Sequence, residues 1–274
     1  NRGYEISLNA TILNTKDFGV NAFINFAHNE GKLMKISEAL KAYNERVDDY
    51  LTLRYTSYAN AAQQSLPFLK YEEGGSLSSI WGVRSLGINP ADGQEVLLNR
   101  QGMMTKAWSA SDQVVLGTTE PTVQGTFGFN VVYKQFSLFT DFMYEAGGQR
   151  YNQTLVDKVE NVNVYTDNVD KRVLTGRWQK PGDIAKYKSL VTGRDPVKNT
   201  KPTSRFVQDY NMLSWNSLEL GYDLSPDITN KLNVSMVRFT FGMSDILHLS
   251  SVKQERGISY PFARTVTFSL KVSL

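Results

Sequence analysis

The sequence predicts an all-β protein whose antiparallel strands cross a membrane as part of a β-barrel. First, residues 265–274 alternate strictly between apolar and polar side chains, over roughly the ten residues that a tilted strand needs to cross a bilayer. Second, similar alternating stretches recur along the chain, separated by short turns and long polar segments in turn. Third, no stretch approaches the ~18 consecutive apolar residues of a membrane-spanning helix.

The composition is compatible with a barrel and argues against other classes of protein. Of the 274 residues, 41% are hydrophobic. The mean hydropathy is only −0.35, as in a barrel, where the side chains that face the lumen are polar. The net charge is +3 with Lys and Arg scattered among acids, so we expect no nucleic-acid partner. There is no Cys, and neither histidine has a second ligand at metal spacing, so we expect no metal and no other cofactor.

The first two strands are predicted to form a hairpin. Residues 4–12 and 18–29 both alternate, and only a polar break at 15–17 separates them. Residues 30–75 show no sustained period of two and are predicted to be a long loop. A short helix within 36–53 would be compatible with the sequence, but the pattern is poor.

Two weaker strands are predicted at residues 76–86 and 94–100. Between them, residues 89–93 have the sequence N-P-A-D-G. Pro fixes φ and Gly frees it, so this segment is predicted to be a turn. Residues 101–122 are predicted to be another loop.

The clearest predicted hairpin consists of residues 123–133 and 136–147, joined by Lys134 and Gln135. Residues 148–205 then form a polar segment of about sixty residues without alternation, and a structureless loop of that length is unusual in a compact soluble domain. Long outward loops and short inward turns are typical of outer-membrane barrels.

Three strands complete the prediction. Residues 206–224 and 231–242 are joined by a short turn, 243–261 are predicted to be the final loop, and 262–274 hold the last strand. The alternation slips within 231–242, so the pattern does not say which face of the sheet carries Arg238.

Together these stretches give about nine antiparallel strands, and the connections between them are alternately short and long. If the long connections are extracellular, the last strand runs inward and residue 1 lies outside. An open sheet cannot sit in lipid, because each unpaired backbone group would cost several kcal/mol. We therefore expect residues 1–274 to be one domain, the C-terminal portion of a larger barrel whose other strands are not in this chain.

Several segments carry motifs of a known family. They are residues 74–93 with G-G-S-L-S-S-I-W-G and the turn N-P-A-D-G, 117–142 with Y-K-Q-F-S-L-F, 169–183 with R-W-Q-K-P-G-D, 211–222, and 256–274 with G-I-S-Y-P-F-A-R. In this order they resemble the C-terminal part of the barrel of SusC/RagA-like TonB-dependent transporters of Bacteroidetes outer membranes. The family commonly ends on an aromatic residue, whereas this sequence ends on Leu274.

The resemblance implies a barrel of about 22 strands in the bacterial outer membrane, with active import of an oligosaccharide or a peptide. Family members work with a SusD-like surface lipoprotein that closes over the barrel, and TonB acts through a plug that this chain lacks. The expected partners are therefore the N-terminal remainder of the barrel, a SusD-like lipoprotein, TonB, and outer-membrane lipid and lipopolysaccharide. Pairs of transporter and lipoprotein are expected to form dimers. The sequence does not distinguish import of a glycan from import of a peptide.

Candidate contact residues lie in the longest predicted loop. Arg177 and Trp178 would be able to stack on a sugar face or on a partner. Tyr151, Tyr165 and Tyr187 share that loop. For each of these side chains, packing that stabilises the loop itself is the competing interpretation.

Two other classes of protein are the alternatives. A soluble all-β carbohydrate-binding module of a secreted protein would also alternate, but its strands are usually shorter, about five or six residues. A glycoside hydrolase needs two carboxylates that face each other across the substrate. Asp48 with Asp49, and Glu72 with Glu73, are neighbours in sequence and do not give this geometry. We therefore expect no enzymatic activity.

Overall fold

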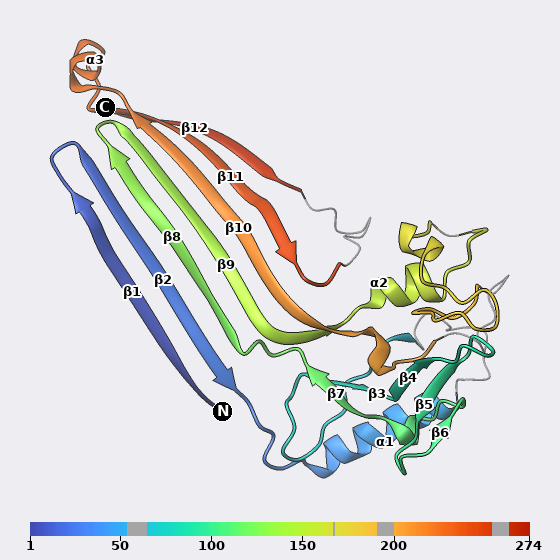
Figure 1. Cartoon of the computed structure of the whole chain (residues 1–274). Coiled ribbons are helices and arrows are strands. Elements are labelled where there is room, and N and C mark those ends of the chain that lie inside the picture. The colour runs from blue at the N-terminus through green and yellow to red at the C-terminus, as the bar shows by residue number, and fades with distance from the viewer. Residues whose placement is uncertain (54–64, 167, 191–199, 254–262) are drawn as a thin grey trace.

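The main feature of the fold is one large antiparallel sheet (Figure 1). The computed structural model describes residues 1–53, 65–166, 168–190, 200–253 and 263–274. The sheet has seven strands in the order β1-β2-β8-β9-β10-β11-β12. Their bounds are Arg2–Asn14, Phe18–Glu30, Val123–Tyr133, Phe136–Tyr151, Val207–Asp223, Met236–Ser250 and Thr265–Ser273, in that order. The predicted all-β class, with antiparallel strands long enough to cross a bilayer, is confirmed.

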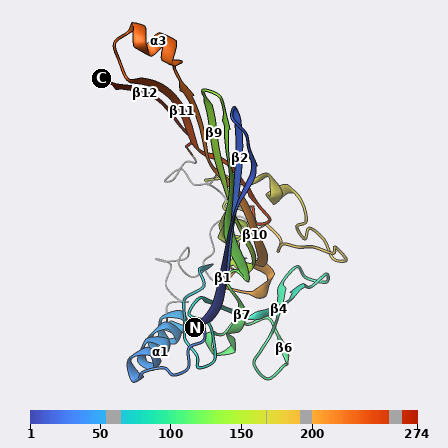
Figure 2. The ribbon, with the colours of Figure 1, turned by 90° about the vertical axis from the view of Figure 1, so that its left-hand side faces the viewer.

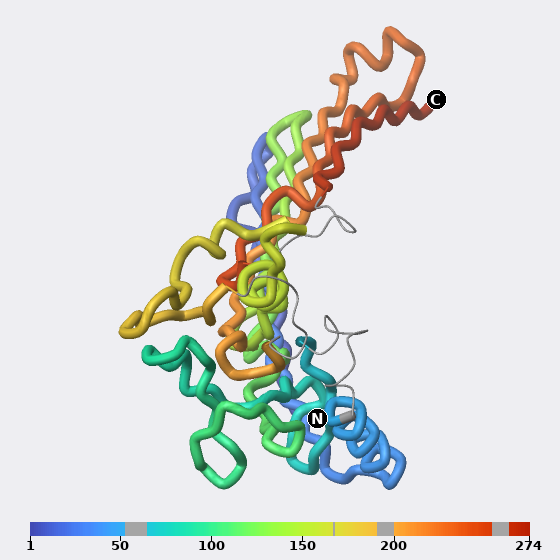
Figure 3. The backbone as a smooth tube through the Cα atoms, turned by 90° about the vertical axis from the view of Figure 1, so that its right-hand side faces the viewer, coloured from blue at the N-terminus to red at the C-terminus, as the bar shows by residue number. Residues whose placement is uncertain are grey.

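The sheet is a curved wall, and its two ends differ. Seen from its edge it is thin and bent (Figure 2). The C-terminus lies at one end, near helix α3 (Pro226–Lys231), and the N-terminus lies at the other (Figure 1). The connections β1–β2, β8–β9 and β10–β11 lie at the end near α3. The longer connections gather at the opposite end, hereafter the loop end (Figure 3).

The two faces of the sheet differ in chemistry. On one face, Phe241 lies opposite Phe268 and Phe239 lies opposite Leu270. On the other face, Ser269 lies opposite Thr240. Many large side chains of the apolar face are exposed, among them Ile6, Leu8, Phe129, Leu220, Phe239 and Phe268. Exposed apolar residues that alternate with polar ones are typical of strands with one face toward lipid.

Arg238, whose face the sequence left open, lies on the polar face. It lies opposite Lys271 on β12 and Asp223 on β10. Its guanidinium donates a hydrogen bond to Ser137 Oγ at 2.7 Å and lies 3.5 Å from a carboxylate oxygen of Asp223. The polar face therefore binds this cation through neighbours from two other strands, β9 and β10.

Within the described residues the main sheet has seven strands, so the prediction of about nine strands in it was wrong. The stretches at 76–86 and 94–100 form short strands in two small sheets at the loop end. β3 (Ser79–Gly82) pairs with β7 (Val114–Thr118). The other small sheet has β5 (Glu95–Leu98) between β4 (Arg84–Ile88) and β6 (Met104–Thr105). These strands are too short to cross a bilayer, and β3 is buried along its whole length. The predicted loop at 101–122 therefore also contains strands.

β11 begins and ends later than predicted. Pro226 begins α3, a short helix that continues to Lys231, because Pro suits the first turn of a helix. The strand then continues past Gly242 to Ser250, through a bulge at which Asp245 has a φ of 55°. A bulge adds one residue to one strand and shifts the alternation, so a strict period of two does not follow β11 to its end.

Residues 38–53 form a helix in a segment predicted to be a loop. Helix α1 (Glu38–Leu53) begins after Ser37, whose Oγ accepts a hydrogen bond from the backbone N–H of Leu40. Val47 and Leu51 lie one turn apart and pack in a buried cluster with Ala110. The helix is stabilised by this contact with a distant part of the chain, which a local pattern does not reveal.

The longest predicted loop is also folded in its described parts. It contains α2 (Gln153–Leu155), a π-helical turn at Val156–Glu160 and a 3-10 turn at Lys171–Leu174. Further 3-10 turns lie at Ala110–Asp112 and Ser204–Phe206. A buried cluster, hereafter the loop core, consists of Leu155, Val156, Val159, Val162, Val173 and Phe206. None of the helices in the described ranges has the length and apolar composition needed to span a membrane.

Candidate functional site at the loop end of the sheet

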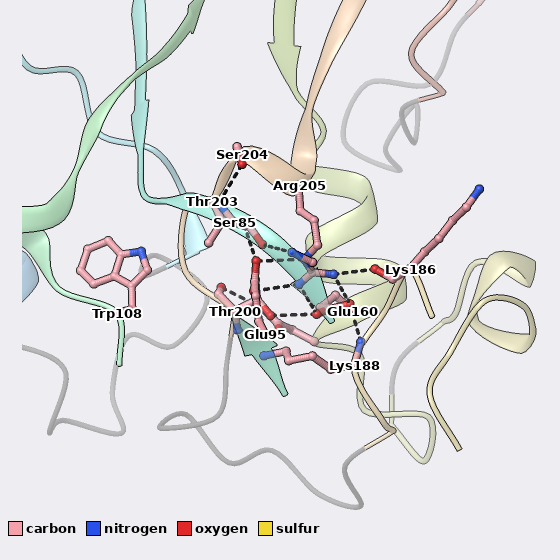
Figure 4. Close-up of polar contacts among 12 residues, drawn as sticks. Ser85, Glu95, Trp108, Glu160, Lys186, Lys188, Thr200, Thr203, Ser204 and Arg205 are labelled. Carbon is pink, nitrogen blue, oxygen red and sulfur yellow. Dashed lines mark hydrogen bonds and ion pairs between the residues drawn. The ribbon is translucent and has the colours of Figure 1, made fainter. Parts of the chain in front are cut away.

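A buried charge cluster lies where the loops join the sheet, and Arg205 is its centre (Figure 4). The Arg205 guanidinium donates to both carboxylate oxygens of Glu95 at 2.9 Å and to Glu160 Oε1 at 2.6 Å. It also donates to the backbone carbonyl of Lys186 at 2.7 Å. One side chain therefore binds three separate segments of the chain.

Local structure places each member of the cluster. Arg205 lies in the 3-10 turn that leads into β10, Glu95 is the first residue of β5, and Glu160 ends the π-helical turn. Thr203 Oγ1 donates to Glu95 at 2.9 Å, and Thr200 Oγ1 donates to Glu160 at 3.1 Å. These hydroxyl groups supply further hydrogen bonds that buried carboxylates require.

The electrostatics of the cluster favour the ionised forms of Glu95 and Arg205. Burial by itself would raise the pKa of Glu95, but the hydrogen bond and the positive charge of Arg205 outweigh it and lower that pKa. Burial likewise opposes the charge of Arg205, whose pKa is nevertheless raised by Glu160 and Glu95. Because Arg205 binds both carboxylates, it holds β5 and the π-helical turn to the start of β10. The cluster therefore has the geometry of an anchor for the loops.

Two of the predicted contact residues, Arg177 and Tyr187, lie side by side near this cluster. They form an isolated parallel β-bridge. Arg177 donates to the backbone carbonyls of Lys188 at 2.9 Å and Glu160 at 3.4 Å, and Tyr187 packs against the loop core. Burial lowers the pKa of Arg177 and raises that of Tyr187.

Trp178 joins two of the segments that carry family-like motifs. Its Nε1 donates to the carbonyl of Pro90 at 2.9 Å, within the N-P-A-D-G turn. A Cβ atom added to Gly93 would lie 2.5 Å from the Trp178 ring, and Gly93 has a φ of 70°. Only glycine fits both the conformation and this close approach. The 176–187 segment therefore packs directly on the 89–93 turn.

The remaining predicted residues are in different surroundings. Tyr151 ends β9, and its ring lies edge-on to Phe206 with 6.0 Å between ring centroids. Tyr165 is 75% exposed. The structure thus brings Tyr151, Tyr187 and Arg177 around the loop core, places Trp178 on a turn and leaves Tyr165 at the surface. Contact of these side chains with a substrate or a partner stays a prediction.

Sequence reasoning missed Glu95, Glu160 and Arg205. The ion pairs join residues 45 and 110 positions apart, and no local pattern indicates such a pairing. A weak signal was the position of Arg205, directly before a long alternating strand. Most of the closing G-I-S-Y-P-F-A-R motif, at 257–262, lies outside the described residues.

The chain is similar in sequence to two curated proteins of Formosa agariphila. TonB-dependent receptor P3 is 24% identical over 254 residues, which are 90% of this chain and 24% of that protein. TonB-dependent receptor P39 is 23% identical over 281 residues, which are 85% of this chain and 25% of that protein. The chain spans about a quarter of the length of these relatives. No family model matches it.

Solved structures share the fold. The RagAB peptide importer in its closed-closed state superposes with a TM-score of 0.70 at 18% identity, covering 99% of this chain and 29% of the other. The open-open state gives a TM-score of 0.69 at 19% identity, covering 99% and 28%. The chain therefore has the fold of one part of this importer structure.

Proposed function

We propose that this chain, which resembles the SusC/RagA-like TonB-dependent transporters of the bacterial outer membrane in sequence and in fold, works in the active import of a nutrient. It lies in the outer membrane and contributes barrel wall and loops at the mouth. The observation that supports this proposal most directly is the main sheet, whose long strands have one apolar and one polar face. The relatives are named as receptors and the solved structures as importers, so no catalytic step is part of this proposal.

The first proposed partner is the remainder of the same barrel. Within the described residues, β1 pairs with β2 alone and β12 pairs with β11 alone. The outer edges of both strands leave backbone N–H and C=O groups without ladder partners, at a cost in lipid of several kcal/mol each. We infer that further strands of the transporter, N-terminal to this segment, pair with these two edges.

The other proposed partners act at the two ends of the sheet and at its apolar face. A SusD-like lipoprotein would cover the loop end, and TonB would act through a plug held inside the complete barrel. Outer-membrane lipid and lipopolysaccharide would contact the apolar face. Two such transporter–lipoprotein pairs would form a dimer.

The substrate is an oligosaccharide or a peptide. Among the proposed contact residues, Tyr165 is exposed and is best placed to reach a substrate or the lipoprotein. Arg177, Trp178, Tyr151 and Tyr187 would act from within the loops that shape the mouth. A soluble carbohydrate-binding module is not favoured, because such a module would leave the apolar face of the sheet in water.

The test is import by living cells. In the bacterium that carries the gene, the full-length gene is deleted, and growth is measured on defined peptides and on defined oligosaccharides as the sole nutrient. We expect loss of growth on one of the two. The intact gene should restore it, whereas a gene lacking the TonB-contacting segment should not. Unchanged growth after deletion, or restoration by both genes alike, would contradict TonB-dependent import.

A further inference from the structure

A cavity lies at the loop end between the segment before β3 and the last residues of β9. Its volume is about 530 Å³, within the range of about 300–1,000 Å³ that is typical of small-ligand sites. Its lining residues are Pro67, Phe68, Leu69, Leu77, Ser78, Ser79, Ile80, Thr119, Arg150 and Tyr151. None of them belongs to the Arg205 charge cluster.

The wall of the cavity is mainly apolar and is held by the rest of the loop end. The Phe68 ring packs against Tyr50 of α1, with 5.4 Å between ring centroids. Ile80 lies on the fully buried strand β3. Leu69 and Leu77, in contrast, are exposed. The cavity therefore has a fixed apolar floor and accessible apolar residues at its rim.

Arg150 supplies a positive charge at the wall of the cavity. Its guanidinium carbon lies 3.6 Å from the centroid of the Tyr210 ring. No carboxylate in the described ranges pairs with it. A guanidinium carries five N–H donors in a planar fork. This fork matches the two oxygens of a carboxylate, which is therefore the group that Arg150 is best suited to bind.

We propose that this cavity binds a peptide through one apolar side chain, with a neighbouring peptide carboxylate on Arg150. This inference rests on the proposed import function and names the class of substrate. A sugar carries hydroxyl groups around its ring, and burial against Pro67, Leu69 and Leu77 would leave several of them without partners. An aliphatic side chain loses no hydrogen bond there, and its transfer out of water is favourable in free energy.

The test is direct binding to the full-length transporter, purified in detergent with its lipoprotein partner, by titration calorimetry. The probes are acetyl-Gly-Gly-Leu, its C-terminal amide, acetyl-Gly-Gly-Ser and acetyl-Gly-Asp-Leu-amide. The free acid with Leu should bind at least about tenfold more tightly than the amide or the Ser peptide. The Asp peptide tells whether a side-chain carboxylate replaces the terminal one.

Variants assign this preference to the cavity. Arg150→Gln should weaken binding of acetyl-Gly-Gly-Leu by about tenfold to a hundredfold, and Arg150→Lys, which keeps the charge, should retain part of it. Leu77→Ser should remove the preference for Leu over Ser. Leu86→Ser is the matched control, because Leu86 is 57% exposed against 58% for Leu77 and lies on β4 outside the cavity.

Several results would overturn the proposal. They are equal binding of the amide and of both peptides that carry a carboxylate, an unchanged affinity in Arg150→Gln, and failure of every peptide probe to bind the wild type. In each case TonB-dependent import would stand, because cell growth tests it separately. Conversely, selective peptide binding with no TonB-dependent growth would leave the cavity assignment intact and remove the import function.

Discussion

Arg205 is the residue on which the loop end depends most. Its guanidinium binds Glu95 and Glu160, and the Glu160 side chain has no exposed surface. Removing ions from water is costly, so a buried cluster of this kind is stable only while every charge has its partner. Loss of the central cation would leave two buried carboxylates facing each other.

We therefore predict that Arg205→Gln destabilises the loop end by about 3–5 kcal/mol. Local opening of the loops should become much more frequent, because it no longer breaks the ion pairs. The measurement is the rate at which an added protease cleaves within residues 153–190 of the full-length protein in outer-membrane vesicles. The control is Lys41→Gln, which also removes one positive charge but breaks the exposed Lys41–Glu38 pair. Equal cleavage rates in the two variants would refute the anchoring role.

A second prediction concerns Lys201, which lies 5.7 Å from the centroid of the Trp108 ring. Burial, and then the charge of Lys188, lower the pKa of Lys201 from 10.5 to about 8. From pH 8 to 10.5 the unfolded chain holds more protons on this amine than the folded protein does. The contribution of Lys201 to stability therefore rises with pH across that window.

The measurement for Lys201 is acylation by an amine-reactive reagent, followed by mass spectrometry over a range of pH. Only the neutral amine reacts, so labelling of Lys201 should be half-maximal near pH 8. Lys41 is the internal reference, because its hydrogen bond to Glu38 raises its pKa above the usual value. Parallel labelling curves for the two lysines would contradict the prediction.

At the scale of the single element, β12 shows how a strand can be built for a lipid face. Phe268 and Ser269 are neighbours in the middle of the strand and point to opposite faces. Phe268 is 81% exposed, as a side chain is when its surroundings are lipid. Ser269 lies opposite Thr240 on the polar face.

We predict that Phe268→Lys impairs insertion of the full-length transporter, whereas Ser269→Lys is tolerated. A lysine on the lipid face near the middle of the bilayer costs about 2–4 kcal/mol, while a lysine in the lumen remains in water. The measurement is the amount of protein in the outer-membrane fraction whose gel mobility changes on heating. If both variants inserted equally well, the assignment of the two faces would be wrong.

At the scale of the whole molecule, the described residues form a sheet that is an open wall with edges at β1 and β12. Membrane barrels avoid open edges because lipid offers no hydrogen bonds to the backbone. We predict that residues 1–274 expressed alone give no heat-modifiable, protease-resistant species in the outer membrane, whereas the full-length protein does. An unboiled gel of the two samples decides this. A folded species from residues 1–274 alone would mean that the sheet closes by itself.

The sequence by itself determined the approximate positions of the long strands and, except in β11, the faces of their side chains. In β12, and over much of β1 and β8, apolar and polar residues alternate, and that period is a local property of an extended backbone. The positions of the hairpins were also predictable from the sequence. A break of two residues between two strands, such as Lys134-Gln135, is long enough only for a tight turn that pairs them antiparallel. The likeness of the 74–93 and 169–183 motifs to a transporter family was also visible in the sequence.

Only the tertiary structure decided which conformations the segments between the long strands adopt and what they contact. It showed that the strands near 80 and 96 lie outside the main sheet, that residues 38–53 form a helix, and that Arg205 joins Glu95 to Glu160. The physical reason is common to all of these cases. Short elements are too weak to form through local preference alone, so contacts between residues far apart in the chain select their conformation.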